Sequence, residues 1–195
     1  TSVTQGADNN KVVVEFNDNV DLETATNEDN YTVDGAVVES AVATGDTANV
    51  ITLTLKVDSN TFTGIRNVTV KNVKKLNGTT AMDTQTMVSA SLNENVAPTV
   101  VSAVLVSTTE VKLTFSEAVQ NGAKADFVLL VGGEEVATKV TTGTIADNTV
   151  VLTLGKAVST DDLTKDLAIK AATTLDITDL LDNKLSVPTS ITIAQ

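Results

Sequence analysis

The side chains in this sequence with the greatest capacity for chemistry are acids and amides, which gather in three clusters. Their members are Asp18, Asp21 and Glu23; Asn93, Glu94 and Asn95; and Asp176, Asp179, Asp182 and Asn183. Calcium takes roughly six to eight oxygen ligands from carboxylates, amides and backbone carbonyls, so each cluster is a candidate calcium site. None follows the ordered spacing of an EF-hand loop, and solvated loop charges are the alternative interpretation.

Two carboxylates held close together could instead work as acid and base on a glycosidic bond. Among the candidates, Glu15 alternates with the apolar Val14 and Phe16, which places it on the solvent face of a strand, where little raises its pKa. The sequence has no His and no Cys, which excludes zinc and iron–sulfur sites as well as Ser–His–Asp and Cys–His nucleophiles. We therefore expect no enzyme activity, no catalytic residue and no required cofactor, with calcium as the one ion that the clusters could bind.

The net charge of the chain is −12, and both halves carry an excess of acid. Nucleic-acid binding depends mainly on Lys and Arg contacts to phosphates, so we expect no nucleic-acid partner. No run approaches the roughly 18 apolar residues of a membrane span, and the chain opens without a basic-then-apolar signal peptide. We therefore expect no membrane insertion.

The elements that must position these residues are arranged as an internal repeat. Residues 11–20 (KVVVEFNDNV) and 110–119 (EVKLTFSEAV) follow one pattern, 99 positions apart, and residues 49–55 match 148–154 at the same offset. A period near 100 residues is too long for a solenoid unit and matches a self-sufficient sandwich domain. The sequence therefore predicts two copies of one module.

The boundary between the copies is predicted to lie near Pro98. Proline lacks a ladder donor and favours an extended residue before it, so residues 93–98 are predicted to be a short, stiff connector. The two domains would cover residues 1–96 and 97–195. Because Thr1 aligns with the first strand of the second copy, the first domain is predicted to begin inside a truncated first strand.

The composition predicts the fold class. Thr and Val supply 63 of the 195 residues, and such stiff β-branched side chains favour strands. We predict an all-β chain with about seven short strands in each of two β-sandwiches. Phe16 and Phe115 are predicted to occupy equivalent buried positions. Tyr31 aligns with Phe127 and is predicted to be a core residue whose hydroxyl reaches the edge.

Turn and cap signals predict some local structure. Asp34-Gly35 lies between two strand patterns and predicts a type I′ hairpin, in which both central residues have positive φ; Gly132-Gly133 takes the same place in the second copy. Residues 159–165 contain the capping residues and early acids of a helix N-terminus, so one or two helical turns are predicted there.

Residues 97–119 (APTVVSAVLVSTTEVKLTFSEAV) resemble the opening of the bacterial Ig-like modules of surface-layer (S-layer) proteins. In those modules a proline-led first strand precedes a strand that ends in F-S-E-x-V. Residues 12–20 and 30–35 are similar in the first copy, which departs from the pattern at Asn17-Asp18. The resemblance implies two tandem Ig-like β-sandwiches.

The same resemblance implies a function and a location. The chain would be a segment of a secreted protein that self-assembles into a two-dimensional lattice on the bacterial cell wall, often with calcium supporting the assembled form. Its domains would be rigid spacers and lattice contacts, its partners would be neighbouring copies of the parent protein, and the isolated fragment would be monomeric. The alternative is a binding module, either in a surface adhesin or as an accessory domain of an extracellular hydrolase.

Overall fold

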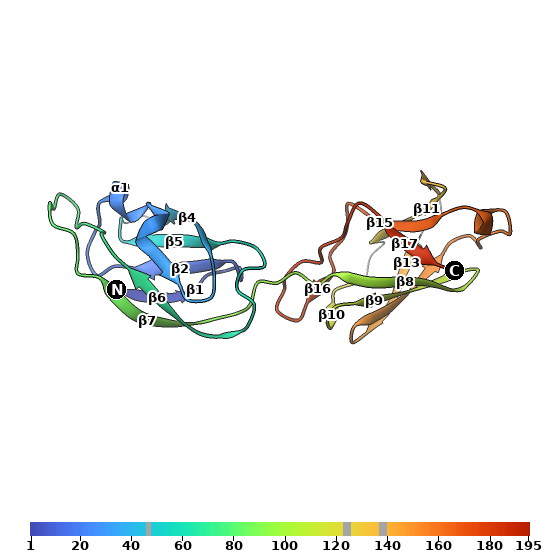
Figure 1. The fold of residues 1–195 in the computed structure, drawn as a ribbon, viewed down its shortest axis with the longest axis horizontal. Coiled ribbons are helices and arrows are strands. Elements are labelled where there is room, and N and C mark those ends of the chain that lie inside the picture. The colour runs from blue at the N-terminus through green and yellow to red at the C-terminus, as the bar shows by residue number, and fades with distance from the viewer. Residues whose placement is uncertain (46–47, 123–125, 137–139) are drawn as a thin grey trace. The chain divides into compact units, whose positions relative to one another are not determined.

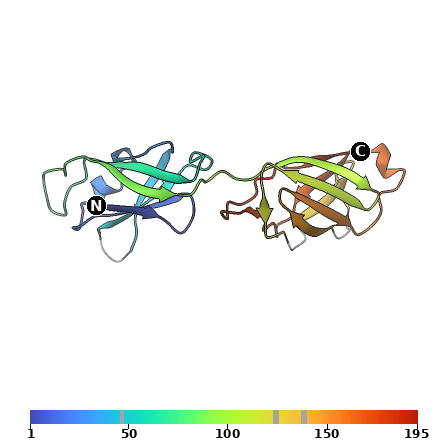
Figure 2. The same cartoon turned by 90° about the horizontal axis from the view of Figure 1, so that it is seen from below.

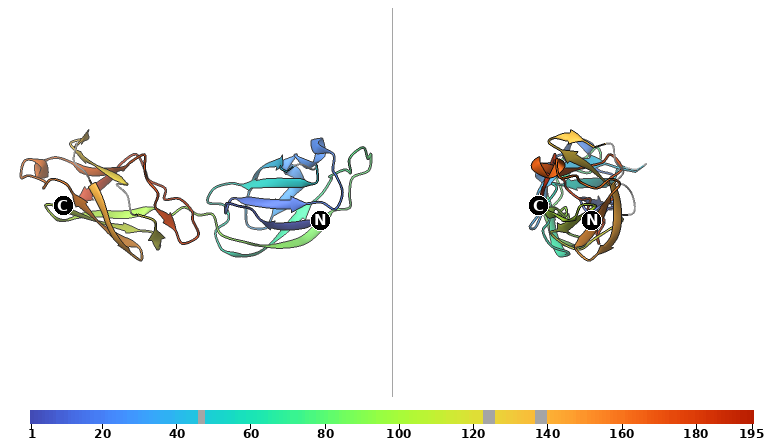
Figure 3. Two further views of the ribbon diagram at one scale, coloured as in Figure 1. Left: turned by 180° about the vertical axis from the view of Figure 1, so that it is seen from behind. Right: turned by 90° about the vertical axis from the view of Figure 1, so that its right-hand side faces the viewer.

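The computed structural model describes residues 1–45, 48–122, 126–136 and 140–195 (Figure 1). The chain forms two compact units, Thr1–Val96 (unit 1) and Ala97–Gln195 (unit 2), each of which is described by itself. Within each unit the strands lie in two layers, which Figures 2 and 3 show from other sides. None of the helices that the structure describes is long and apolar enough to cross a membrane.

Unit 1 is built from a four-stranded and a three-stranded sheet. The first sheet has the order β1 (Ser2–Gln5), β2 (Lys11–Glu15), β5 (Val50–Leu55), β4 (Val38–Ala43). The second has the order β3 (Tyr31–Val33), β6 (Gly64–Val70), β7 (Gln85–Leu92). A short helix, α1 (Leu22–Ala25), and a 3₁₀ turn, η1 (Glu28–Asn30), connect β2 to β3.

Unit 2 repeats this plan with additions. Its counterpart of the first sheet has the order β8 (Val100–Ser107), β9 (Glu110–Phe115), β14 (Thr149–Leu154), β13 (Val140–Ala146). Its counterpart of the second contains β12 (Glu134–Glu135), β11 (Phe127–Val131), β15 (Leu167–Ala171) and β17 (Ile191–Ala194). Because β17 also pairs with β8, the two counterparts join into one eight-stranded sheet. The remaining elements are the pair β10 (Val119–Gln120) and β16 (Thr178–Asp179), and the 3₁₀ turn η2 (Asp162–Thr164).

This strand order identifies the fold. Labelled A to G in chain order, the seven strands of unit 1 form an A-B-E-D sheet and a C-F-G sheet, which is the arrangement of an Ig-like β-sandwich of the constant type. Unit 2 contains the same seven strands plus three short ones. The predicted fold class, an all-β chain with two tandem Ig-like β-sandwiches, is confirmed.

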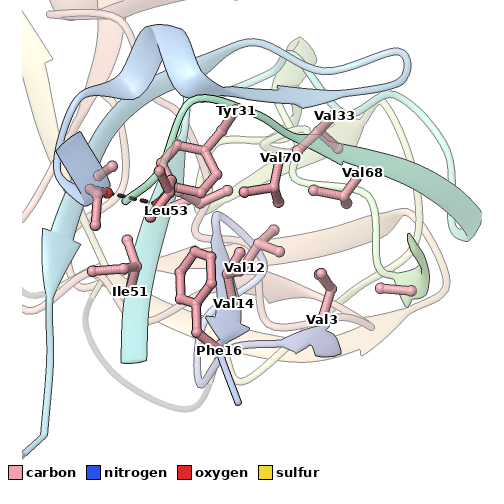
Figure 4. Packing of buried hydrophobic residues seen from close by; sticks show 14 of the residues in the cluster. Val3, Val12, Val14, Phe16, Tyr31, Val33, Ile51, Leu53, Val68 and Val70 are labelled. Carbon is pink, nitrogen blue, oxygen red and sulfur yellow. Dashed lines mark hydrogen bonds between the residues drawn. The ribbon is translucent and has the colours of Figure 1, made fainter. Parts of the chain in front are cut away.

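Alternating side chains build each core. In unit 1 the inward residues of β2 and β5, among them Val12, Val14 and Leu53, are fully buried. Figure 4 shows Phe16 and Tyr31 pointing into the same part of this interior, next to Leu53. Phe115 has the same place in unit 2 and is buried as well.

A pair of asparagines fixes the two phenylalanine backbones in the same way. The N–H of Phe16 donates to the Asn49 carbonyl at 2.8 Å, and Asn49 Nδ2 donates back to the Phe16 carbonyl at 3.1 Å. Asn148 makes the same two bonds with Phe115, at 2.8 and 3.2 Å. The predicted equivalence of Phe16 and Phe115 as buried residues is confirmed.

A tight turn forms at Asp34-Gly35, but the predicted type I′ hairpin is wrong there, whereas its counterpart in unit 2 exists. Gly132 and Gly133 have positive φ (58° and 85°) and join β11 to β12 in a two-residue hairpin. Of the pair Asp34-Gly35, only Gly35 has positive φ (74°), and the turn is closed by the N–H of Ala36, which donates to the Val33 carbonyl at 3.1 Å. The N–H of Asp34 donates across to the Asn67 carbonyl. The chain therefore leaves β3 in one sheet and enters β4 in the other.

Candidate functional site

The first predicted calcium cluster is divided among separate structural roles. Asp21 is the N-cap of α1, and its Oδ1 accepts hydrogen bonds from the backbone N–H and the hydroxyl of Thr24, at 3.1 and 2.9 Å. Asp18 forms an exposed ion pair with Lys75 at 3.2 Å. Glu23 is exposed in the first turn of α1, where its charge suits the helix dipole.

The third cluster organises a loop of unit 2. Asp179 is buried, and its Oδ1 accepts the backbone N–H groups of Leu181 and Asn183, both at 2.8 Å. Its Oδ2 accepts Asn183 Nδ2 at 2.8 Å. Asp182 Oδ1 accepts Gln120 Nε2 at 3.1 Å. This set of bonds holds the chain reversal that follows β16.

Two acids outside the predicted clusters, Asp126 and Glu117, lie beside this loop of unit 2. The backbone N–H of Asp176 donates to Oδ1 of the fully buried Asp126 at 3.2 Å. Burial and the charge of Asp179 together raise the pKa of Glu117 above its ordinary value. Within either unit, no three carboxylates among the described residues come within 4.8 Å of one another. Calcium binding by the three clusters stays a prediction.

The second cluster anchors the end of unit 1. Asn95 is buried, and all of its polar groups are bonded to the loop at 56–60. Its backbone N–H donates to the Asn60 carbonyl and its Oδ1 accepts the Asn60 N–H, both at 2.9 Å. Its Nδ2 donates to the Lys56 carbonyl at 3.0 Å, and its own carbonyl accepts the Asp58 N–H at 3.1 Å. An amide bonded on every side is a structural residue.

Asn93 and Glu94 add further bonds to this anchor. The backbone N–H of Asn93 donates to Gln5 Oε1 at 2.8 Å, and its Nδ2 donates to Asn9 Oδ1 at 3.1 Å. Glu94 Oε2 accepts the N–H of Val96 at 2.6 Å. The segment that follows β7 is therefore fixed to unit 1 through Asn95.

A buried arginine supports the loop that holds Asn95. Arg66 Nε donates to Asn60 Oδ1 at 2.9 Å, and its Nη2 donates to the Phe62 carbonyl at 3.0 Å. Its guanidinium also lies over the Phe62 ring, 3.3 Å from the centroid, as a cation–π contact. Asn60 therefore connects Arg66 of β6 to Asn95.

Sequence reasoning missed Arg66, although the sequence contains a signal for it. Arg66, Val68 and Val70 alternate along β6, so the strand pattern places the arginine on the inward face. An arginine in such a position is almost never buried unless it is paired. Gln5 and Asn60 carry no comparable local signal, because their partners lie far away in the sequence.

Pro98 and Thr99 are hydrogen-bonded to other residues of unit 2. The Pro98 carbonyl accepts the N–H of Ser186 at 2.9 Å. The N–H of Thr99 donates to Ser116 Oγ at 3.0 Å, and the Thr99 carbonyl accepts the Ser116 N–H at 2.9 Å. Two residues, Val96 and Ala97, separate Asn95 of unit 1 from Pro98 of unit 2.

Unit 1 also has a small pocket at the end where β1 begins. Its volume is about 160 Å³, and its lining includes apolar Phe16, Val20 and Met82 together with the charged Asp18 and Lys74. Binding sites for small molecules usually enclose about 300–1,000 Å³. The pocket is too small to assign a ligand of that kind to it.

Comparison with known proteins gives little information about function. No family model and no curated protein sequence matches the chain. The chain is similar to a crystal structure of the I9–I11 tandem from titin, with 11% sequence identity and a TM-score of 0.32. The match covers 100% of this chain and 64% of the titin chain. The Ig-like assignment therefore rests on the strand order.

Proposed function

We propose that this chain is a structural segment of a secreted bacterial surface-layer protein, in which its two units serve as spacer and lattice-contact domains. The observation that carries the spacer role is the anchoring of Asn95, whose polar groups are all bonded inside unit 1. The resemblance of residues 97–119 to S-layer modules supports the location on the bacterial cell surface. The partners in this proposal are neighbouring copies of the parent protein.

The path of the chain through each unit suits a spacer. In unit 1 the chain enters beside Asn17, whose Oδ1 accepts a hydrogen bond from the amino group of Thr1. It leaves the unit at Asn93, which lies beside the other end of β1 (Figure 1). In unit 2 it enters at β8 and leaves after β17, which runs parallel to β8. The chain therefore enters and leaves each unit at opposite ends, as expected for a spacer domain.

The connector is built to limit bending. Flexible linkers are typically rich in Gly and Ser, whereas residues 93–98 contain neither and end in a proline. Because only Val96 and Ala97 lie between the two anchored residues, few backbone angles are left to vary. This proposal gives the chain no catalytic role.

A distance measurement between the units tests the spacer role. The chain has no Cys, so Ser89→Cys and Thr153→Cys, both at exposed positions, introduce two clean labelling sites for spin labels. We expect a narrow distance distribution that broadens in the Asn95→Ala variant. The matched control is Thr44→Val, which removes the hydrogen bond between the Thr44 and Thr52 hydroxyls and leaves the connector intact. A distribution that is equally broad with and without Asn95 would overturn the spacer role.

Imaging of the full-length protein on cells tests the surface-layer role separately. A periodic array on the cell surface is the expected result. A dispersed distribution together with saturable binding of a glycan or host protein by this chain would favour the adhesin or accessory-domain alternative. The two experiments fail independently, because a stiff connector does not require a lattice.

Calcium is proposed as a ligand of the acidic loops of this chain. The motivation is the net charge of −12 and the exposed carboxylates of the loops, such as Asp18 and Glu23. Weak extracellular calcium sites have Kd values on the order of 10⁻⁴–10⁻³ M, so millimolar calcium is expected to raise the melting temperature by a few degrees. The measurement is a thermal melt in calcium, in chelator, and in magnesium at matched ionic strength. Three identical curves would contradict the proposal.

A further inference from the structure

The two units differ in how the first strand is joined to the last. In unit 2, β17 runs parallel to β8, with Ile193 opposite Ala103 and Ala194 opposite Val104. The other edge of β8 pairs with β9. In unit 1, β1 pairs with β2, and among the described residues no backbone ladder joins β1 to β7. We call the boundary between the first and the last strand of a unit its seam. Backbone pairing closes the seam in unit 2, whereas the seam in unit 1 has no such pairing.

In unit 1 the first and last strands are joined by side-chain hydrogen bonds, among which one to Gln5 lies at the end of β1. Gln5 is the last residue of β1, and its Oε1 accepts the backbone N–H of Asn93, directly after β7, at 2.8 Å. Its Nε2 donates to the Lys11 carbonyl at 2.8 Å and so holds the amide in place. We call the bond from the Asn93 N–H to Gln5 Oε1 the Gln5 latch. A side chain here does what the backbone of β8 does in unit 2.

A tight turn ends β1 at Gln5. The N–H of Gly6 donates to the Lys11 carbonyl at 2.8 Å, and a Cβ at this position would lie 2.5 Å from that of Lys11. Glycine therefore permits a close approach that turns the chain away after Gln5. In unit 2 the corresponding strand continues to Ser107.

Stretching the chain from its ends loads these two seams differently. Tension enters a unit at the start of its first strand and leaves after its last strand, so the bonds that join these strands directly resist it. In unit 2 the paired strands run parallel, so opposite pulls strain the bonds of the ladder together. In unit 1 the corresponding resistance comes from side-chain bonds of Gln5 and Asn93.

We propose that unit 1 opens before unit 2 when the chain is stretched from its ends, and that the Gln5 latch sets how fast unit 1 opens. This inference goes beyond the proposed surface role and does not depend on it. Resistance to forced unfolding is governed by the unfolding rate. An interaction that must break before the unit opens therefore acts directly on that rate.

Single-molecule stretching of the whole chain between handles at its two termini tests the order of opening. To identify unit 1, a Gly/Ser segment is inserted between Thr79 and Thr80, in an exposed loop of that unit, so that its opening releases more length. The expected result is that the opening event at lower force releases more chain length than in the protein without the insertion. The order is overturned if the event at higher force becomes longer, or if both events occur at the same force.

The latch is tested with a matched pair of variants in unit 1. Gln5→Leu removes the latch, together with the bonds from Gln5 Nε2 to the Lys11 and Asp8 carbonyls, and keeps a side chain of similar size. Thr44→Val removes the bond between the Thr44 and Thr52 hydroxyls, which does not touch the seam. Gln5→Leu is expected to open unit 1 about fivefold faster, as for one lost hydrogen bond, and to leave unit 2 unchanged.

Hydrogen exchange at the Asn93 amide provides a second test of the latch that does not depend on comparing forces. In folded Gln5→Leu the amide of Asn93 should exchange faster, because the structure gives it Gln5 Oε1 as its acceptor. Equal opening rates for unit 1 in the wild type and Gln5→Leu, or an equal acceleration by Thr44→Val, would overturn the role of the latch. An unchanged exchange rate at Asn93 would do the same.

Discussion

At the scale of single residues, amide side chains join the loops of unit 1. Asn60 accepts from Arg66, exchanges hydrogen bonds with Asn95 and so links β6 to the connector. Buried polar groups of this kind must be fully satisfied, because an unsatisfied one costs about 1–3 kcal/mol. The precise position of the connector therefore depends on a few side chains.

Tyr31 shows how burial and one hydrogen bond combine in the core. Its ring is buried as predicted, but its hydroxyl donates to the Ala25 carbonyl at 2.6 Å within the interior and does not reach the edge. Burial raises the pKa of this hydroxyl far above its ordinary value, so it remains a donor throughout the range in which the protein is folded.

The Tyr31→Phe variant is expected to destabilise unit 1. It keeps the ring and removes the donor to Ala25, so the free energy of unfolding should fall by about 1–3 kcal/mol. Denaturant unfolding followed by circular dichroism measures this change. A variant as stable as the wild type would show that the Ala25 carbonyl finds another donor.

Glu117 gives a prediction about pH. Burial and the neighbouring Asp179 raise the pKa of Glu117 in the folded state, so the folded protein binds its proton more tightly than the unfolded chain. The stability contributed by the protonated form is present below the unfolded pKa and is lost as the pH rises through the folded pKa. Glu117→Gln should therefore stabilise unit 2 at pH 7 and have less effect near pH 4.

The control for this prediction is Glu39→Gln, an exposed position on β4 in the other unit. Denaturant unfolding at both pH values provides the comparison. A loss of stability at pH 7 in Glu117→Gln would show that the charged carboxylate makes a favourable contact that outweighs its burial and repulsion.

At the scale of elements, caps and turns follow local rules where neighbouring residues suffice to form them. Within the predicted segment, Asp162–Thr164 form one 3₁₀ turn, η2, whose N-cap residue Asp161 makes no side-chain cap bond. Ser159 and Asp162 exchange backbone-to-side-chain hydrogen bonds just before it, in the pattern of a capping box. The two hydrogen bonds from Ser159 lower the pKa of the Asp162 carboxyl. The local signal was sufficient because both partners lie three residues apart.

The hairpin of unit 2 offers a test of backbone strain. Gly133 has a φ of 85° and open space around the position of a Cβ, so Gly133→Ala should cost about 1–2 kcal/mol through the backbone alone. Gly133→Asn should cost less, because asparagine tolerates positive φ better. Denaturant unfolding of unit 2 measures both. Equal losses in the two variants would argue against backbone strain as the cause.

The register of β3 and β11 shows where the repeat is only approximate. Tyr31 lies opposite Val70, whereas Phe127 lies opposite Ala171 and Leu129 lies opposite Ile169. At the repeat offset of 99 positions, Val70 corresponds to Ile169, so Tyr31 should correspond to Leu129. The predicted alignment of Tyr31 with Phe127 therefore differs from this register by two residues. A shift of two keeps the same face inward, so both cores remain apolar.

At the scale of the whole molecule, each unit has its own hydrophobic core. Unfolding of one should therefore leave the other intact. The chain has one Tyr and no Trp, so Tyr31 fluorescence reports on unit 1 alone. This makes the independence of the two cores measurable in the intact chain.

Phe115→Ala is expected to destabilise unit 2 by about 3–5 kcal/mol, because it leaves a cavity in a closed core. Circular dichroism should show an earlier transition, while the Tyr31 fluorescence midpoint stays unchanged. Phe16→Ala is the matched variant and should shift the fluorescence midpoint. A shift of Tyr31 fluorescence in Phe115→Ala would show that the two units unfold as one.

The sequence by itself determined the fold class, the repeat and the positions of the main core residues. Period-two alternation and β-branched composition are properties of a few neighbouring residues. They can therefore be interpreted without knowing which distant residues are in contact. The same local reasoning identified the helical turn within residues 159–165 and the turn at Gly132-Gly133.

The tertiary structure alone decided which sheet each strand joins and what the polar residues do. Asp34-Gly35 connects two sheets because Asp34 bonds to Asn67, and Asn95 is a structural amide because Asn60, 35 positions away, meets it. The Gln5 latch joins residues 88 positions apart. Such pairings depend on which loops the folded chain brings together, and a hydrogen bond between distant residues leaves no periodic pattern in the sequence.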